Sequence, residues 1–344
     1  MTFNSEGNGA DASSLPNYKV IRVGDVAFEG HSNKSFAYGR FVVNAVADGI
    51  MSPRFSCLRP KNSYPVRFWK YYIHSEQVMR DILVRATKSG TMMNELVIDD
   101  LFKQSIAVPQ EAEQQAIGYF FSHLDTLITL HQRKYDKLVV FKKSMLEKMF
   151  PKDGESVPEI RFAGFTDPWE QRKASEVFQI VDDRGHPTLP VLSATQNQGM
   201  IYRDDSGRYI GHDESNEIGY KRVLPGDFVV HLRSFQGGFA HSQYEGITSP
   251  AYTVFRAKEP TSHSDRFWKH WFMSEHFIAG LSTVTYGIRD GRSISVDEFM
   301  NTFLAFPAVE EQAAISRLFD YLDDLITLHQ RKRLSIRQRS PVWS

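Results

Sequence analysis

The sequence contains a single cysteine, Cys57, among its 344 residues. One thiol cannot form an internal disulfide or build a metal site from several cysteines, and this scarcity is typical of a reducing compartment. A free cysteine often behaves as a small buried apolar group. We therefore interpret Cys57 as a core residue and keep a nucleophilic thiol as the lesser alternative.

Long apolar runs and an excess charge of one sign are also missing. No segment approaches the roughly 20 consecutive apolar residues that cross a bilayer, and the polar N-terminal segment lacks the apolar stretch of a signal peptide. We therefore expect a cytoplasmic protein with no membrane partner. Basic and acidic residues number 41 each, so any binding of nucleic acid must come from local clusters.

The common motifs of enzymes are absent as well. There is no Walker loop, no dinucleotide-binding glycine fingerprint, no zinc-spaced set of His and Cys, and no Gly-x-Ser-x-Gly elbow. The 12 histidines are scattered along the chain. We therefore predict no catalytic residue, no metal site and no cofactor bound by this chain, and a stand-alone hydrolase or methyltransferase is disfavoured.

What the sequence does contain is a long internal repeat. The heptapeptide Ile-Thr-Leu-His-Gln-Arg-Lys at residues 128–134 returns unchanged at residues 326–332. A Glu-Gln pair precedes each copy at the same distance, at residues 113–114 and 311–312. Self-similarity at a fixed long offset indicates a duplicated architecture, so we predict two similar halves.

Each repeat lies in a segment with the periodicity of a long helix. Apolar residues recur in steps of four and three, which is the seam of a coiled coil, and Pro151 ends the first copy. The two helices are natural partners, and they could pack antiparallel because a folded domain separates them. The predicted seam consists of Ile117, Phe121, Leu124, Ile128 and His131 in the first copy and Ile315, Phe319, Leu322, Ile326 and His329 in the second.

Polar residues interrupt this seam. A histidine at a seam position usually fixes the register, and a metal-binding or pH-sensing role for His131 and His329 is the lesser alternative. Lys142 and Arg333 also fall on the seam. We expect the pairing of the helices to loosen at both of these charges.

The remaining sequence predicts an α+β fold, with two mixed α/β domains separated by long antiparallel coiled-coil helices. Short β-branched and aromatic runs between turn residues predict strands at 20–23, 41–46, 55–58, 177–181, 189–192, 200–202 and 209–210, and residues 67–83 predict an amphipathic helix. The expected segments are a disordered leader (1–16), a first domain (17–109), a first spacer helix (110–150), a linker (151–168), a second domain (169–307) and a second spacer helix (308–344).

Polar loops that differ between the halves indicate contact with nucleic acid. Arg and Lys can contact phosphates or guanine, and Asn and Gln can pair with adenine. Each such residue could equally be an ordinary solvated surface position. The DNA-binding candidates are Arg184, Gln196, Gln198, Arg203, Arg233, Ser234, Gln236, Arg289 and Arg292 in the second half, and Asn33, Lys34, Arg40, Lys88 and Asn94 in the first.

Over about residues 17–340 the chain resembles the specificity (S) subunit of type I DNA restriction-modification systems. The resemblance rests first on Pro-Glu-Ile-Arg-Phe-Ala-Gly-Phe at residues 158–165, followed by Trp169 and Glu170. It rests also on the Pro-x-x-x-Glu-Gln start of each long helix, on Leu-Asp-x-x-Ile within each helix, and on Gly-Arg-Ser-Ile at residues 291–294.

The resemblance implies a non-catalytic subunit with two target-recognition domains, each reading one half of a bipartite site in double-stranded DNA. The spacer helices would dock modification subunits, which transfer a methyl group to adenine N6, and the complex would include a restriction subunit, an ATP-dependent translocase and nuclease. S-adenosylmethionine, ATP and Mg²⁺ would belong to these partners.

Two departures from the family leave alternatives open. The first domain has no counterpart of residues 169–218, and the last helix lacks the Met-Leu-Glu-Lys-Met-Phe sequence that ends its twin at residues 145–150. One alternative is therefore an inactive or truncated recombination product of an S-subunit gene. Another is a coiled-coil scaffold whose domains bind protein.

Overall fold

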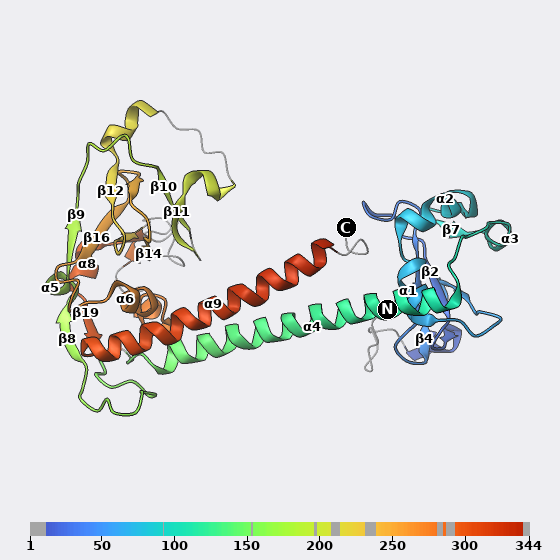
Figure 1. Ribbon diagram of the computed structural model, residues 1–344, viewed down its shortest axis with the longest axis horizontal. Coiled ribbons are helices and arrows are strands. Elements are labelled where there is room, and N and C mark those ends of the chain that lie inside the picture. Colours follow the sequence, from blue (N-terminus) through green and yellow to red (C-terminus); the bar gives the residue numbers. More distant parts are fainter. Residues whose placement is uncertain are drawn as a thin grey trace. The chain divides into compact units, whose positions relative to one another are not determined.

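The computed structural model describes residues 12–339 apart from 92, 153, 196–197, 208–213, 231–238, 281–284 and 287–292. The described chain forms two compact units, shown in Figure 1. The first unit contains residues 12–134 and 329–339, and the second contains residues 135–328. The division falls inside two long helices, α4 (Glu111–Lys148) and α9 (Val309–Arg339).

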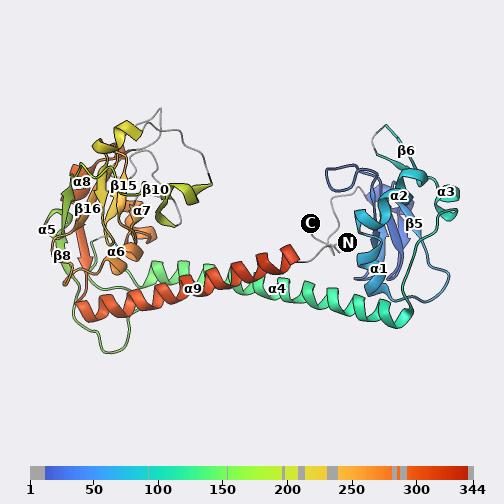
Figure 2. The same cartoon turned by 45° about the horizontal axis from the view of Figure 1, so that its top comes forward.

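The first unit is built on a small antiparallel sheet with the strand order β3-β2-β5. Phe28, Phe41 and Val43 project from this sheet onto Met79 and Leu83 of the second helix, and together they form the core. The helices α1 and α2 lie beside the sheet in Figure 2. The strands are β1 (Lys19–Ile21), β2 (Val26–Glu29), β3 (Arg40–Val43), β4 (Gly49–Met51), β5 (Ser56–Leu58), β6 (Thr87–Lys88) and β7 (Glu95–Leu96), and the helices are η1 (Ala12–Asn17), α1 (Val66–Tyr72), α2 (Glu76–Ala86) and α3 (Ile98–Phe102).

Two predictions for the first unit are wrong. Residues 67–83 form two helices, because Ile73 caps α1 and Ser75 takes an extended conformation before α2 begins. This break lets α2 turn its own apolar face, with Met79 and Leu83, onto the sheet. Part of the expected disordered leader is ordered, because Ala12–Asn17 forms a 3-10 helix.

The second unit is built on a four-stranded antiparallel sheet with the order β14-β13-β16-β9. Its strands are β8 (Glu170–Lys173), β9 (Phe178–Val181), β10 (Leu192–Thr195), β11 (Gly199–Tyr202), β12 (Lys221–Val223), β13 (Phe228–Val230), β14 (Phe239–His241), β15 (Gly246–Thr248), β16 (Thr253–Ala257), β17 (Thr285–Tyr286), β18 (Ser293–Ile294) and β19 (Phe303–Phe306). Its short helices are α5 (Ala174–Val177), η2 (Arg203–Ser206), η3 (Glu214–Gly219), α6 (Asp265–Trp271), α7 (Glu275–Gly280) and α8 (Val296–Asn301).

An aromatic cluster forms the core of the second unit. Trp268 is fully buried, and its ring centroid lies 5.2 Å from that of Phe178 on β9. Trp271 and Phe272 are buried in the same cluster. Two aromatic residues of α6 and the Phe272 that caps it therefore pack in the core of the second unit.

Some strand predictions need correction. The strand expected at residues 189–192 begins only at Leu192, because Pro190 has no N–H for a ladder. The strand expected at 177–181 begins one residue later, after the short helix α5. Strand β2 was not predicted, since only three apolar residues precede the charged Glu29. The strand expected at 209–210 lies outside the described residues.

The predicted duplication appears as the same turn in both units. Gly24 and Gly226 each have φ of 93°, a backbone conformation that only glycine adopts without strain. The aspartate that follows accepts the backbone N–H of the residue three positions back. It also pairs with an arginine, at 2.7 Å for Asp25 with Arg59 and 2.8 Å for Asp227 with Arg256. Arg59 lowers the pKa of Asp25, whereas burial raises the pKa of Asp227.

Two further observations bear on the expectations from composition. Cys57 is half-buried on β5, and burial raises the pKa of its thiol. A raised pKa keeps the thiol protonated and therefore poorly nucleophilic, which favours the interpretation as a packing residue.

Within the described ranges, no helix is long and apolar enough to cross a membrane.

Candidate nucleic-acid interface

The seam of α9 lies against the C-terminal part of α4 in the second unit. Ile315, Phe319 and Leu322 are at most 4% exposed. The ring centroids of Phe319 and Phe150 are 5.8 Å apart, and the Nζ atom of Lys142 is 2.6 Å from Oδ1 of Asp323. Residue numbers fall along one helix as they rise along the other, so this part of the predicted antiparallel pairing is confirmed.

The other predicted seam residues are also turned inward. Ile128 is 7% exposed. Ile117, Phe121 and Leu124 of α4, and Ile326 of α9, are half-buried. By contrast, Tyr119, Phe120 and Tyr321 on the outer faces of the helices are 60–61% exposed. The heptad pattern therefore identified the buried face of both helices.

The expectation that Lys142 and Arg333 loosen the seam is wrong. The side chain of Lys142 is only 11% exposed, because it pairs with Asp323 from the opposite helix. Arg333 donates a hydrogen bond from Nη1 to the side-chain oxygen of Gln132. A buried charge is tolerated when an opposite charge or an acceptor compensates its desolvation. Both charged residues therefore contribute a cross-helix contact.

In the first unit, the histidines of the two heptapeptides meet each other. The Nδ1 atoms of His131 and His329 are 2.9 Å apart, and the ring centroids are 5.1 Å apart. A neutral imidazole has one donor and one acceptor nitrogen, so one ring can donate to the other while both are uncharged. Burial lowers the pKa of each histidine, and Lys134 and Lys332 lower it further.

This pair should make the helix pairing sensitive to acid. Because the folded-state pKa lies below the ordinary value of 6.5, the unfolded state takes up protons first as the pH falls. The contribution to stability is therefore fully present above about pH 6.5 and declines below it. Urea unfolding measures the decrease in the free energy of unfolding between pH 7.5 and pH 5.5. This decrease should be smaller for the variant His131→Gln/His329→Gln than for the wild type. His74, His263 and His270 also have lowered pKa values, but they are unchanged in both proteins, so an equal loss would contradict the prediction.

Each spacer helix is clamped to its own domain by corresponding contacts. In the first unit, Lys70 of α1 pairs with Asp125 of α4 at 2.9 Å, and Tyr71 donates a hydrogen bond to the same carboxylate. In the second unit, Lys269 of α6 lies 3.6 Å from Asp323 of α9, and the neighbouring His270 lies 3.0 Å from Asp320. The sequence Arg-Phe-Trp-Lys occurs at residues 67–70 and 266–269, and Leu-Asp occurs at 124–125 and 322–323. These repeated sequences therefore encode a contact between domain and helix.

The Pro-x-x-x-Glu-Gln start of the helices has a structural explanation in both units. The Nε2 atom of Gln114 donates to the carbonyl of Pro109 at 2.8 Å, and that of Gln312 donates to the carbonyl of Pro307 at 2.9 Å. Both glutamines are at most 9% exposed. The glutamine thus closes the first turn of the helix onto the residue that precedes it.

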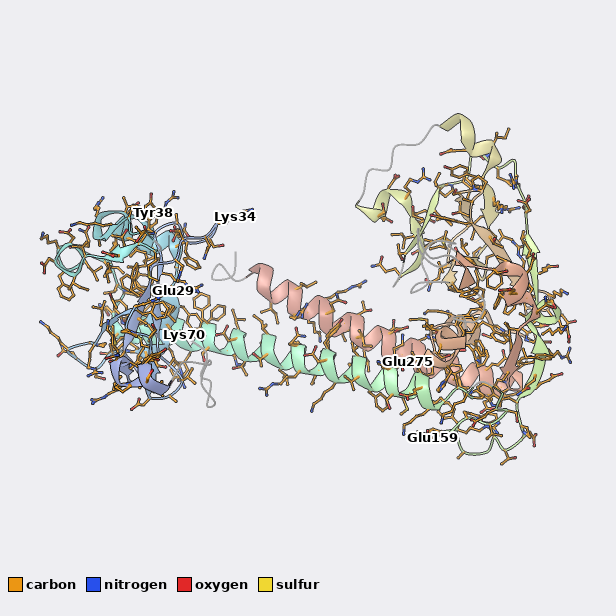
Figure 3. All side chains as sticks on the ribbon, turned by 180° about the vertical axis from the view of Figure 1, so that it is seen from behind. Glu29, Lys34, Tyr38, Lys70, Glu159 and Glu275 are labelled. Carbon is orange, nitrogen blue, oxygen red and sulfur yellow. The ribbon has the colours of Figure 1, made fainter. Side chains whose placement is uncertain are left out.

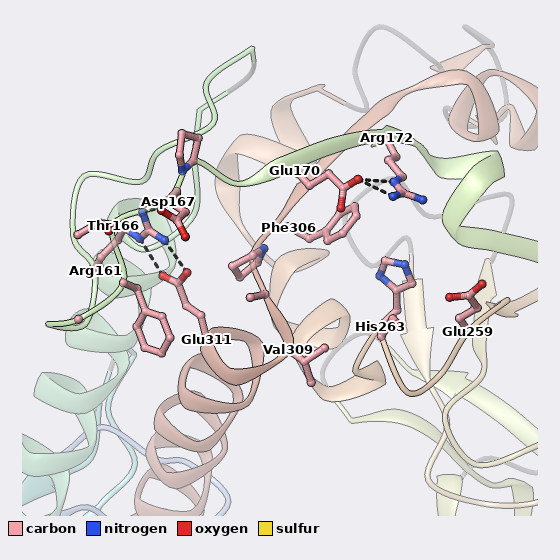
Figure 4. Close-up of a pocket in the computed structure, with 16 residues that line it drawn as sticks. Arg161, Thr166, Asp167, Glu170, Arg172, Glu259, His263, Phe306, Val309 and Glu311 are labelled. Carbon is pink, nitrogen blue, oxygen red and sulfur yellow. Dashed lines mark hydrogen bonds and ion pairs between the residues drawn. The ribbon is translucent and has the colours of Figure 1, made fainter.

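The Pro-Glu-Ile-Arg-Phe segment at residues 158–162 is anchored by a buried ion pair. Arg161 donates to both carboxylate oxygens of Glu311, at 2.9 and 2.7 Å, and the two side chains are 12% and 2% exposed. Figure 4 shows this pair at the rim of a pocket of about 440 Å³ beside the start of α9. Arg161 also donates to the carbonyl of Asp167. The segment therefore ties the expected linker to α9.

Most described candidates of the first unit have structural partners. Asn33 accepts the N–H groups of Ser35 and Phe36, Arg40 pairs with Glu29 at 2.6 Å, and Asn94 donates to Ser32. Lys34, labelled in Figure 3, and Lys88 are exposed and show no side-chain bond to the described residues. These two lysines are therefore available to an external ligand.

The described candidates of the second unit also divide into residues with structural partners and exposed residues. Arg184 pairs with Asp182 at 2.7 Å, and the guanidinium of Arg203 lies 5.9 Å from the ring centre of Tyr220. Gln198 is exposed. The Arg184 pair is itself exposed, and such surface pairs contribute little to stability, so Arg184 could exchange its partner for a phosphate. The candidates that lie outside the described residues are Gln196, Arg233, Ser234, Gln236, Arg289 and Arg292.

Comparison with known proteins finds relatives of similar sequence. No protein-family model matches the chain. The type I restriction enzyme MjaVIII specificity subunit of Methanocaldococcus jannaschii is 23% identical over 307 residues, which cover 84% of this chain and 71% of the relative.

Two solved structures share the fold. One comes from a study of complex assembly and conformational transition of the type I R-M system, with 15% identity, a TM-score of 0.50, and coverage of 93% of this chain and 80% of the other. The other is the type I restriction-modification system S subunit from M. genitalium, with 10% identity, a TM-score of 0.50, and coverage of 95% and 83%.

Proposed function

Because the chain belongs to the specificity subunits of type I restriction-modification systems, we propose that it is the non-catalytic subunit that recognises double-stranded DNA for such a complex. The observation that supports this proposal most directly is one duplicated scaffold with divergent loops. The same Gly-Asp turn and the same domain-to-helix clamp occur in both units. The polar loops around this framework differ in sequence between the halves.

Two different readers on one scaffold suit a bipartite DNA site. Linking two weak binding modules makes the second binding event intramolecular, which raises affinity without enlarging either module. At a rise of about 1.5 Å per residue, a helix as long as α4 extends further than one turn of DNA, about 34 Å. The two half-sites would therefore be separated by base pairs that neither domain reads.

The partners of the subunit would supply the chemistry. We assign S-adenosylmethionine and methyl transfer to adenine N6 to modification subunits, and ATP, Mg²⁺ and cleavage to a restriction subunit. Methylation of a base inside a duplex requires the base to be flipped out, and a partner enzyme could do this while the recognition domains hold the flanking sequence. The outer faces of α4 and α9, with exposed Phe120 and Tyr321, are candidates for docking these partners.

Footprinting of the reconstituted complex tests this proposal. Methylome sequencing of cells that carry the full complex gives the modified site, and footprinting then shows which phosphates and bases the complex covers. We expect protection of two short segments separated by an unread gap. Protection of one contiguous segment would contradict the bipartite proposal.

A coiled-coil scaffold that binds only protein is the competing function. Phosphate contacts release counterions, so log affinity for DNA falls steeply with log salt concentration, whereas a largely apolar protein interface responds weakly. A salt titration of binding to the duplex site therefore distinguishes the two functions.

Gln198 allows a residue-level prediction within the described structure. It is exposed beside the β10–β11 turn, and its backbone N–H donates to the hydroxyl of Thr195. If its amide pairs with adenine, Gln198→Ala should weaken binding by about 1–3 kcal/mol and relax specificity at one base position. Binding to a library substituted at each position measures this effect. Lys103→Ala, at an exposed site on the surface of the first unit, is the control, and equal weakening on every sequence would assign Gln198 to the DNA backbone.

A further inference from the structure

The residues around the His131–His329 contact form a positively charged patch. Residues 126–134 of α4 and 329–336 of α9 contain five arginines and lysines and no aspartate or glutamate. Arg133, Lys134, Arg331 and Lys332 are exposed. None of these four side chains has an ion pair to the described residues. We call them the midpoint patch. In a chain with equal numbers of basic and acidic residues, such a cluster is a local excess of charge.

The two lysines of the patch converge on one face of the paired helices. Each of them lies close enough to both histidines to lower their pKa values, although each lysine shares a helix with only one of them. Lys134 and Lys332 are also counterparts in the repeat, three residues after the histidine. Two antiparallel helices that meet at equivalent residues are related by an approximate two-fold axis through that contact. Residues at equivalent positions on the two helices therefore lie on the same face of the helix pair. That face therefore presents two ammonium groups across the helix pair.

The patch favours an anion over a metal ion as its ligand. Two imidazole nitrogens at 2.9 Å could in principle hold a transition metal. The surrounding cations oppose a metal ion, however, and a hydrogen bond between neutral rings already accounts for the distance. Phosphate, in contrast, is attracted by each lysine and arginine of the patch and is the usual partner of such clusters in DNA-binding proteins.

We propose that the midpoint patch binds the sugar-phosphate backbone of the DNA segment between the two half-sites. This inference rests on the proposed function, because it requires a bipartite DNA site. Duplex DNA has local two-fold symmetry, so its two strands offer equivalent phosphates across the duplex. Lys134 and Lys332, as counterparts on antiparallel helices, match that arrangement with one contact to each strand. Phosphate contacts carry no sequence information, which agrees with a gap whose bases are unread.

The test is a double-mutant cycle on the reconstituted complex with its modification subunits. The first change is Lys134→Ala/Lys332→Ala, and the second replaces gap phosphates of the duplex site by uncharged methylphosphonates. We expect the variant to lose about 1.8 from the slope of log affinity against log salt, at about 0.9 per phosphate, with unchanged base preference. We also expect the two changes to be non-additive, because each removes the same contact. Lys103→Ala/Lys148→Ala removes the same charge outside the patch and should remain additive.

Each outcome decides the proposal. Additive effects, or an unchanged salt slope, would overturn the patch assignment while leaving sequence-specific binding intact. Loss of complex assembly in the lysine variant, measured by light scattering without DNA, would assign the patch to an acidic partner surface and also overturn it. Failure of the wild-type complex to bind any bipartite site would instead overturn the proposed function itself.

Discussion

Replacing Phe319 by alanine is expected to lower the free energy of unfolding of the second unit by about 3–5 kcal/mol, the range for truncation of a buried aromatic side chain. Phe319 is fully buried on the seam of α9. Its ring contacts Phe150, two residues after the end of α4, and His270 on α6, with centroid distances of 5.8 and 5.2 Å. One side chain thus joins both spacer helices and the second domain, and its loss leaves a cavity that three elements would have to fill.

Urea unfolding followed by circular dichroism measures this effect. Tyr321→Ala is the matched control, because Tyr321 lies two residues further along α9 and is 61% exposed. Its truncation should change stability by less than about 1 kcal/mol. Similar losses in the two variants would mean that α9 does not bury the face that its heptads present.

Arg161→Ala should produce a loss of comparable size, about 3–5 kcal/mol, through a different mechanism. The substitution leaves the carboxylate of Glu311 unpaired at a position where that side chain is 2% exposed, and an uncompensated buried charge is strongly destabilising. The pair also holds the segment around Arg161 against the first turn of α9. Thermal or urea unfolding of the variant measures the loss.

Two controls separate charge burial from other causes. The double variant Arg161→Met/Glu311→Leu removes both charges together and should recover most of the stability, since an apolar pair of similar volume can replace a buried ion pair. Arg172→Ala breaks the neighbouring pair with Glu170, visible in Figure 4, whose side chains are 50% and 53% exposed. That change should cost about 0–1 kcal/mol. No recovery in the double variant would contradict the explanation by an unpaired charge.

The sequence predicted the parts of the fold that depend on local repetition. The heptad pattern identified the buried face of α4 and α9, because a helix repeats its environment every three to four residues. The heptapeptide and the Glu-Gln pair that precedes it identified the duplication. The break between α1 and α2 was not predictable from periodicity, because apolar residues continue through Ile73 and the change of direction is imposed by the sheet on which α2 packs.

Contacts between distant residues were beyond pattern analysis. Lys142 is a charged residue at an apolar position of the heptad pattern, and the residue that compensates its charge, Asp323, lies 181 residues away in the sequence. Glu311 follows Arg161 at a distance of 150 residues. In both ion pairs, the two charged residues are far apart in the sequence, so a local pattern does not reveal the pair. The same holds for the polar candidates of the first unit, since Arg40 pairs with Glu29 on the neighbouring strand and Asn94 donates to Ser32, 62 residues away.

The position of the repeated heptapeptides has a consequence for inheritance. The boundary between the two compact units falls at residues 134/135 and 328/329, which is within or at the end of the identical segments 128–134 and 326–332. A genetic crossover in that shared stretch would transfer a domain together with its own clamp, such as Lys70 with Asp125. The ion pair of Lys142 with Asp323 would stay whole on the other side. Under the proposed function, such an exchange would combine two half-sites in a new pair, and the contact between His131 and His329 would form again because both copies of the heptapeptide are identical.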